Sequence, residues 1–222
     1  VRSDMAPVKR VELHAHTKMS AMDGLTEIGA LIERVAQRGH PAVAITDHGC
    51  IQAFPEAHQQ AKKHGVKILY GVEAYLVEED RRQRPYHIIL IAMNRRGLKN
   101  LYHLISISYL EHYHRHPKIP RSELTRYREG ILVGSACQAG ELYTAILQGR
   151  THEEITEIAK FYDYLEIQPL SNNEFLLREG QVNSWEDLKR INAQIVALGE
   201  ELGKPVVATG DVHYLDPEHE IF

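Results

Sequence analysis

The residues of this sequence that could do chemistry are histidines, carboxylates and a cysteine, most of them placed directly after short apolar stretches. Two pairs have a spacing of two residues: His14 with His16, and Asp211 with His213 near the other end. Because side chains along a strand repeat every second residue, each pair presents both side chains to one face. Residues of the same types lie between the pairs: Asp23, His48, Glu73, His87 and Cys137. The set predicts a ring of ligands around several metal ions.

The chemistry that such a set allows is phosphoester hydrolysis. Imidazoles, carboxylates and a thiolate suit zinc, manganese or iron, and the ligand types do not separate these metals. Adjacent ions can clamp a phosphate, lower the pKa of a water molecule and stabilise the leaving oxygen, so no protein nucleophile is needed. We therefore expect two or three divalent metal ions as cofactors.

The composition of the chain indicates what class of protein carries this site. The chain has 222 residues, of which 43% are hydrophobic and 25% charged, as expected for one globular domain with an ample core. The formal net charge of -4 means that any contact with nucleic acid would be local. Two cysteines are too few for a disulfide scaffold and indicate a reducing compartment. Without a long apolar run or a signal peptide, the sequence predicts a cytoplasmic protein with no membrane partner.

The elements that position the candidate ligands alternate between strands and helices. Apolar runs predict strands at residues 8–13, 42–45, 66–70, 131–133, 164–167 and 206–208. Helical spacing predicts helices from Leu25 to a stop at Gly39, over residues 54–64 before Gly65, and from a cap at Ser184. This is the β-α-β rhythm of a parallel sheet or barrel, and its short apolar strands indicate burial on both faces.

One connection breaks the rhythm. Between Glu73 and His87 there is no room for a crossover helix, and a parallel return needs a dozen or more residues. Residues 74–77 and 87–92 therefore predict a hairpin, in which His87 begins its strand on the side where Glu73 ends its own. The charged residues between them predict an exposed loop.

Four motifs carry a family resemblance. Residues 13–17 read Leu-His-Ala-His-Thr, 45–49 Ile-Thr-Asp-His-Gly, 71–75 Gly-Val-Glu-Ala-Tyr and 210–215 Gly-Asp-Val-His-Tyr-Leu. With Cys137, they resemble the nine-ligand pattern of the PHP (polymerase and histidinol phosphatase) domain. Residues 96–102, 120–122, 134–137 and 161–169 make the sequence similar to the PHP region of bacterial DNA polymerase III alpha in its PolC form. The resemblance implies an α/β fold, a distorted barrel of seven β/α units with metals at the strand C-terminal ends.

The resemblance also implies a domain organisation. Residues 1–222 would form a PHP domain within a longer polymerase, since the sequence starts at Val1 without Met and ends directly after a motif. PolC-type proteins usually carry an exonuclease domain where this sequence has a short loop at residues 78–85. Nothing resembles the polymerase palm, so this chain is not expected to polymerise DNA by itself. The implied partners are a DNA primer 3′ end and the rest of the polymerase chain.

The roles of the candidate residues follow from the same resemblance. One ion would be held by four residues, His14, His16, Glu73 and Asp211. A second would be held by Asp23, His48 and His213, and Glu73 would bridge to a third held by His87 and Cys137. The catalytic residues would be Glu73, Asp211 and His213, while Asp47 would orient a ligand.

Three functions remain open from the sequence alone. The first is a PHP domain of a replicative polymerase with 3′-5′ exonuclease or other phosphoesterase activity. The second is the same domain as an inactive scaffold held together by metal, and the third is a stand-alone phosphatase for a small phosphate ester. A histidine-rich run at residues 112–116 resembles a metal tract, but it follows a helix and precedes a proline. It is predicted to be an exposed loop.

Overall fold

A closed ring of strands lies at the centre of the computed structural model, which describes residues 10–80 and 82–219. The strands of the ring, in chain order, are β1 (Ala42–Ile45), β2 (Lys67–Val77), β3 (Tyr86–Ala92), β6 (Ile131–Gly134), β7 (Leu165–Ile167) and β8 (Val206–Ala208). β1 pairs in parallel with β2, β3 pairs antiparallel with both β2 and β6, and β7 pairs in parallel with β8. Single bridges close the remaining gaps, at Gly134 with Tyr164, Glu12 with Val43 and Ala15 with Val212.

The segment around residues 12–15 is therefore the seventh member of the barrel. The prediction of a continuous first strand over residues 8–13 is wrong for its described part, residues 10–13, and residues 8 and 9 lie outside the described residues. The physical reason is local: the backbone N–H of His14 donates to the side chain of Glu12, which interrupts the ladder between two bridges. The α/β barrel predicted from the sequence is confirmed.

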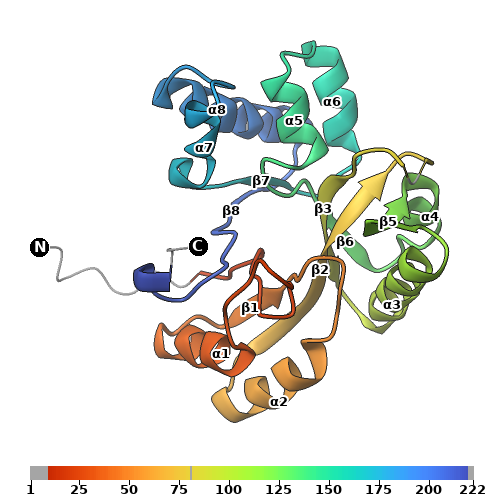
Figure 1. Ribbon diagram of the computed structural model, residues 1–222, viewed down its shortest axis with the longest axis vertical. Helices are drawn as coiled ribbons and strands as arrows, with labels where there is room; N and C mark the ends of the chain where they lie inside the picture. The colour runs from red at the N-terminus through yellow and green to blue at the C-terminus, as the bar shows by residue number, and fades with distance from the viewer. Residues whose placement is uncertain (1–9, 81, 220–222) are drawn as a thin grey trace, which may run out of the picture.

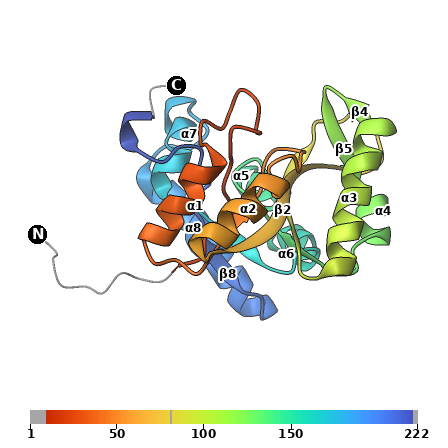
Figure 2. The same ribbon diagram turned by 90° about the horizontal axis from the view of Figure 1, so that it is seen from below.

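The helices surround the strands (Figures 1 and 2). They are α1 (Ile28–Gln37), α2 (Phe54–His64), α3 (Arg95–Leu110), α4 (Arg121–Arg126), α5 (Glu141–Leu147), α6 (His152–Lys160), α7 (Phe175–Arg178) and α8 (Trp185–Leu202), with 3-10 turns η1 (Leu170–Asn173) and η2 (Pro217–His219). The predicted helix ends are confirmed where capping chemistry is strong. Gly65 ends α2 in the left-handed conformation, and the Ser184 side chain accepts a hydrogen bond from the Asp187 backbone at the start of α8.

The core lies between the ring and these helices. The buried stripe of α1 comprises Ile28, Leu31, Ile32 and Val35, spaced as the sequence predicts for a helix with one apolar face. The strands β1 and β6 are buried along most of their length. At about 1.5–3 kcal/mol for each fully buried aliphatic side chain, this packing is the main force that holds the barrel closed.

The predicted hairpin is confirmed as β2 and β3, and Tyr75 pairs with His87. One feature was not predicted: β2 continues through Glu73 as a single strand. Its first half pairs with β1, and its second half pairs with another strand, β5 (His116–Pro120). β5 in turn pairs with β4 (Tyr113–His114), so the predicted loop at residues 112–116 is a short antiparallel hairpin. The prediction of exposure is right, but that of irregular structure is wrong, because β2 offers its free edge to β5.

Among the described residues, no helix has the length and apolar character needed to cross a membrane.

Candidate metal centre

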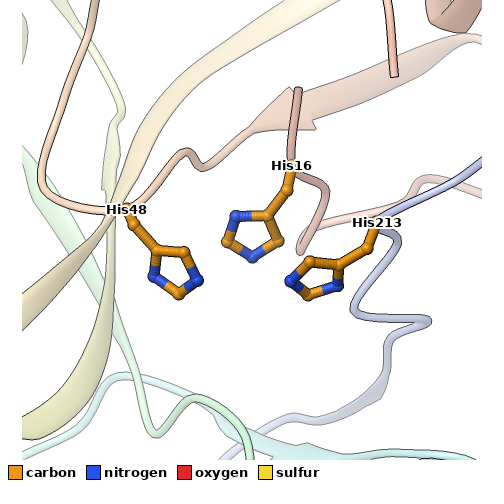
Figure 3. Close-up of side chains that lie close together, drawn as sticks. All are labelled: His16, His48 and His213. Carbon is orange, nitrogen blue, oxygen red and sulfur yellow. The ribbon is translucent and has the colours of Figure 1, made fainter. Parts of the chain in front are cut away.

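The candidate ligands meet at one rim of the barrel. They follow the carboxyl ends of the 12–15 segment, β1, β6 and β8, while the antiparallel β3 contributes His87 from its beginning. Glu73 lies in the middle of β2 and reaches the same space because a bridge pairs it with His48. Figure 3 shows three imidazoles from distant segments pointing into this space; the ring centroid of His16 lies 4.4 Å from that of His48 and 4.3 Å from that of His213.

The innermost group joins both ends of the chain. Its members are His14, His16, Glu73 and Asp211, whose ligand atoms lie within 4.8 Å of one another. The Nε2 atoms of the two histidines lie 3.3 and 3.2 Å from Oε2 of Glu73, and 3.2 and 3.3 Å from Oδ1 of Asp211. Four ligands at about 2.1 Å from one tetrahedral ion would lie about 3.4 Å apart, so the observed spacing fits a shared cation.

Two further groups flank the first. Oδ2 of Asp23 lies 2.7 Å from Nε2 of His48 and 2.9 Å from Nε2 of His213. On the other side, Oε1 of Glu73 lies 2.8 Å from Nδ1 of His87 and 3.5 Å from Sγ of Cys137. All nine candidate ligands named from the sequence thus lie near one another. The first group forms one cluster, as the resemblance implies, whereas His48 clusters both with His16 and His213 and with Glu73 and His87. Asp23 and Cys137 belong to none of these clusters among the described residues, so the grouping into three ions stays a prediction.

Several buried polar atoms at the centre have no hydrogen-bond partner. They are Nε2 of His14, Nε2 of His16, Nδ1 of His48 and Oδ1 of Asp211. Buried polar atoms normally find a partner, and four at one point need an explanation. Since a neutral imidazole nitrogen and a carboxylate oxygen both bind metals, this set of unpartnered atoms fits divalent cations.

Hydrogen bonds behind the ligands fix which nitrogen of each ring is free. Nδ1 of His14 lies 2.7 Å from Oε1 of Glu166, and Nδ1 of His213 lies 2.8 Å from the backbone oxygen of Asp211. Nδ1 of His16 lies 3.0 Å from Oγ of Ser20, which donates to Asp47 at 2.7 Å. With Nδ1 occupied in this way, Nε2 of each ring is left to bind a metal.

Asp47 takes the place expected of an orienting residue. Its carboxylate accepts hydrogen bonds from the Thr17 backbone at 2.6 Å and from the hydroxyls of Thr17 and Ser20.

The electrostatics show a surplus of negative charge at the centre. Burial lowers the pKa of His14, but neighbouring carboxylates, above all Glu166, raise it well beyond its usual value. Burial also lowers the pKa of His16, and contacts with Asp211 and Glu73 raise it to about 9. Burial raises the pKa of Glu73, but His14 and His87 bring it well below its usual value. A site that holds protons on histidines and keeps carboxylates ionised favours cations.

The backbone is strained at one of the candidate ligands and directly before two others. Asp211 has φ of 49°, Met22 next to Asp23 has 64°, and Ala136 next to Cys137 has 59°. Non-glycine residues rarely adopt this left-handed conformation, and they concentrate at functional sites.

A cleft of about 1330 Å³ opens over the centre. Its lining includes the candidate ligands Asp23, His48 and His87, together with Tyr75, Arg84, Tyr109 and His116. The innermost histidines, His14 and His16, are fully buried, so the cleft gives access only to the outer ligands.

Sequence reasoning missed two residues of the centre. Glu166 received no role, although a carboxylate inside the apolar run Leu165-Glu166-Ile167 was a signal that something must pair with it. Ser20 carried no such signal, because its contact with His16 depends on the turn between them.

Comparison with known proteins agrees with this geometry. The sequence model of the PHP domain matches residues 12–169, and the chain belongs to the PHP domain family. The PolC-type DNA polymerase III of Clostridium perfringens is 29% identical, over an alignment of 421 residues that covers 100% of this chain and 29% of that protein. The PolC-type enzyme of Bacillus subtilis is 27% identical, with 100% of this chain and 30% of that protein covered.

Solved structures share the fold. A protein of Bifidobacterium adolescentis described as a metal-dependent phosphoesterase has a TM-score of 0.59 at 16% identity, with 95% of this chain and 90% of that chain covered. An amidohydrolase from Chromobacterium violaceum has a TM-score of 0.53 at 15% identity, with 91% and 87% covered. The chain spans about 29% of the length of the polymerases it matches.

Proposed function

We propose that this chain is the PHP domain of a PolC-type replicative polymerase and that its centre hydrolyses phosphodiester bonds at DNA 3′ ends. The observation that carries the proposal is the position of Glu73. Its Oε2 faces His14, His16 and His48, and its Oε1 faces His87 and Cys137. A carboxylate whose two oxygens face different ligand groups would help to hold a cation in each group.

The proposed roles of the candidate ligands follow from how deeply each is buried. Bound divalent cations supply Lewis acidity, a water molecule of lowered pKa and a clamp on the phosphate. Glu73 and Asp211 hold the inner part of the centre and keep its charge balanced. His48 and Asp23 line the cleft and form the face turned to it, and the partly exposed His213 contacts the same Asp23 oxygen. The cleft admits a DNA end to this outer face, while the buried His14 and His16 fix the geometry beneath it.

The assignment to a polymerase rests on the relatives. Matches to PolC-type polymerases cover 96–100% of this chain, so the rest of such a chain and a primer end are its proposed partners. We propose residues 1–222 as one PHP domain. In the alignment with C. perfringens, 421 positions face the 222 residues of this chain, so nearly half of them have no counterpart here. The short 78–85 loop is the proposed place where relatives carry the additional sequence.

One observation favours a second function, a scaffold held together by metal. The inner ligands come from both ends of the chain, so ions at this centre would hold the barrel closed whether or not they act on a substrate. The scaffold requires the ligands but no access to them, whereas a cleft leads to Asp23, His48 and His87.

Metal analysis combined with a nuclease assay tests the proposal. The 222-residue chain, loaded with manganese or zinc, should release nucleotides from the 3′ end of labelled single-stranded and primed DNA. Glu73→Gln keeps the shape but weakens the bridge, and should cost several orders of magnitude in rate. Activity that persists in Glu73→Gln would identify a contaminating nuclease, and a fully metallated but inactive wild type would favour the scaffold.

A further inference from the structure

A stack of aromatic rings leads from the candidate metal centre into the cleft. The Tyr75 ring lies 6.0 Å from that of His48, with an angle of 19° between their planes. The His116 ring lies 4.6 Å from that of Tyr75, tilted by 31°. Of these three rings His116 is the outermost: its residue is exposed, and it lines the cleft together with His48 and Tyr75.

The fold holds this stack in place. Tyr75 is two residues beyond Glu73 on β2, so both side chains leave the same face of the strand. Tyr75 is the register partner of Lys118 on β5, and His116, two residues before Lys118, shares its face. The turn at Arg115, with φ of 64°, returns β4 against β5 and fixes the residue that follows.

Gly49 ties this hairpin to the centre. A Cβ atom at this position would lie 2.6 Å from Cγ of Pro117 and 3.3 Å from the Tyr75 ring. Pro117 follows His116, and Gly49 follows His48, so the loop that carries a candidate ligand packs directly against the strand that carries the outer ring. The hairpin is thus part of the wall of the site rather than a separate appendage.

Two further aromatic side chains, Tyr109 and Tyr113, lie near the stack of rings. Tyr109 lines the cleft, and its ring lies 6.0 Å from that of Tyr113, nearly parallel at 22°. The two tyrosines are 44% and 52% exposed. A simple phosphate ester would gain nothing from exposed flat rings beside its binding site, whereas every nucleobase has a flat face that stacks on such rings.

We propose that the outer face of His116, backed by Tyr75, is a stacking site for a nucleobase next to the phosphate held at the metal centre. The inference rests on the proposed function and narrows its substrate to single-stranded nucleotide chains with intact bases. Two ring steps separate His48 from His116, so the stacked base belongs to a nucleotide close to the scissile phosphate. In this proposal the metal centre binds the phosphate, and the rings of His116 and Tyr75 bind the base.

A binding experiment without turnover tests this assignment. Two fluorescent tetranucleotides with phosphorothioate linkages are compared, one of thymidylates and one with abasic sites at its last two 3′ positions. Both carry the same charge, so fluorescence anisotropy with the manganese-loaded 222-residue chain isolates the contribution of the bases. Because one base stacks on the ring, the thymidylate strand should bind about tenfold more tightly, which corresponds to about 1.4 kcal/mol.

Variants of one hairpin provide the matched controls. His116→Ala should remove the tenfold preference while binding to the abasic strand stays unchanged, and His116→Phe should retain the preference. His114 is the register partner of His116, is exposed and does not line the cleft, so His114→Ala should behave as wild type. Equal binding of both strands by the wild type, or a preference that survives His116→Ala, would overturn the proposal.

The outcome is independent of hydrolysis. A chain that prefers intact bases but releases no nucleotides would retain the stacking site and lose the proposed nuclease function. A chain that releases nucleotides from unmodified DNA but binds both phosphorothioate strands equally would retain the nuclease function and lose the stacking site.

Discussion

Glu166 accepts a hydrogen bond from Nδ1 of His14 at 2.7 Å, 152 residues away in the sequence, and both side chains are buried. The same oxygen accepts from the Thr209 hydroxyl at 2.6 Å and from the Gln168 amide at 3.0 Å. Glu166 therefore joins three segments behind the centre without reaching it. It sets the orientation of His14 and leaves Nε2 to face inwards.

The first prediction concerns this pair. Glu166→Gln removes the negative charge that strengthens the hydrogen bond to His14, and metal affinity should fall about 10- to 100-fold, as is usual for partners behind metal ligands. Competition with a fluorescent chelator measures the affinity. Glu201→Gln, on the exposed surface of α8, should leave it unchanged. Equal affinities for wild type and Glu166→Gln would show that His14 is held by packing alone.

The second prediction concerns stability. Ions that bind only the folded chain stabilise it by mass action, by about 2.7 kcal/mol at a hundred times the dissociation constant. Exhaustive chelation should therefore lower the Tm, and His48→Ala should remove much of that response. The exposed His152, which pairs with Glu201 on the surface, supplies the control His152→Ala. A Tm that does not respond to chelation would mean that the ions are peripheral to folding.

The third prediction is a pH dependence of the metal-free chain. The pKa of His16 is about 9 in the folded chain against 6.5 for an ordinary histidine. A raised folded pKa stabilises the fold below pH 6.5, and this contribution is lost as the pH rises towards 9. The pKa of His14 and that of His213 are shifted in the same direction. The free energy of unfolding in a chelator should fall over this window, while metal affinity should rise as protons leave the ligands.

Urea denaturation at several pH values between 6.5 and 9 measures the slope. His16→Gln removes the titrating group and should flatten the fall in stability. A metal-free stability that rises with pH would contradict the assignment of protons to the centre.

The fourth prediction concerns the close approach at Gly49. Gly49→Ala forces an alanine into a left-handed conformation and places its Cβ against Pro117. Gly39 has a similar φ, 69° against 58°, and a Cβ atom there would meet nothing within 4 Å, so Gly39→Ala carries the conformational cost alone. That cost is about 1–2 kcal/mol. In urea denaturation, Gly49→Ala should lower the free energy of unfolding by more than Gly39→Ala. Equal decreases would show that the hairpin moves away from the added Cβ atom without cost.

The sequence predicted those parts of the fold that have local causes. The helix over Phe54–His64 ends at Gly65 because only glycine adopts the left-handed stop at little cost. The hairpin between Glu73 and His87 followed from the length of the connection alone. The nine candidate ligands could be named because they are metal-ligand types, most of them follow predicted strands, and their spacing matches a family pattern.

What could not be predicted depends on partners distant in the sequence. Residues 112–116 form strands because the edge of β2 is free to pair with β5. The residues of the histidine-rich run carry no sign of this pairing. The first segment makes single bridges instead of a ladder because Glu12 bonds to the backbone of His14 and of Gly210. The role of Glu166 required knowing that β7 passes behind His14.

The contact between the first and last described segments of the chain has a consequence for folding during synthesis. Ala15 bridges Val212, and the blue C-terminal segment runs beside the red N-terminal segment in Figure 1. A chain still emerging from the ribosome therefore holds His14 and His16 long before Asp211 and His213 exist. The inner cation group cannot assemble until synthesis has passed Asp211, so metal capture would report that these two distant segments have met. Because this contact spans nearly the whole described sequence, it should also be among the last to form during refolding.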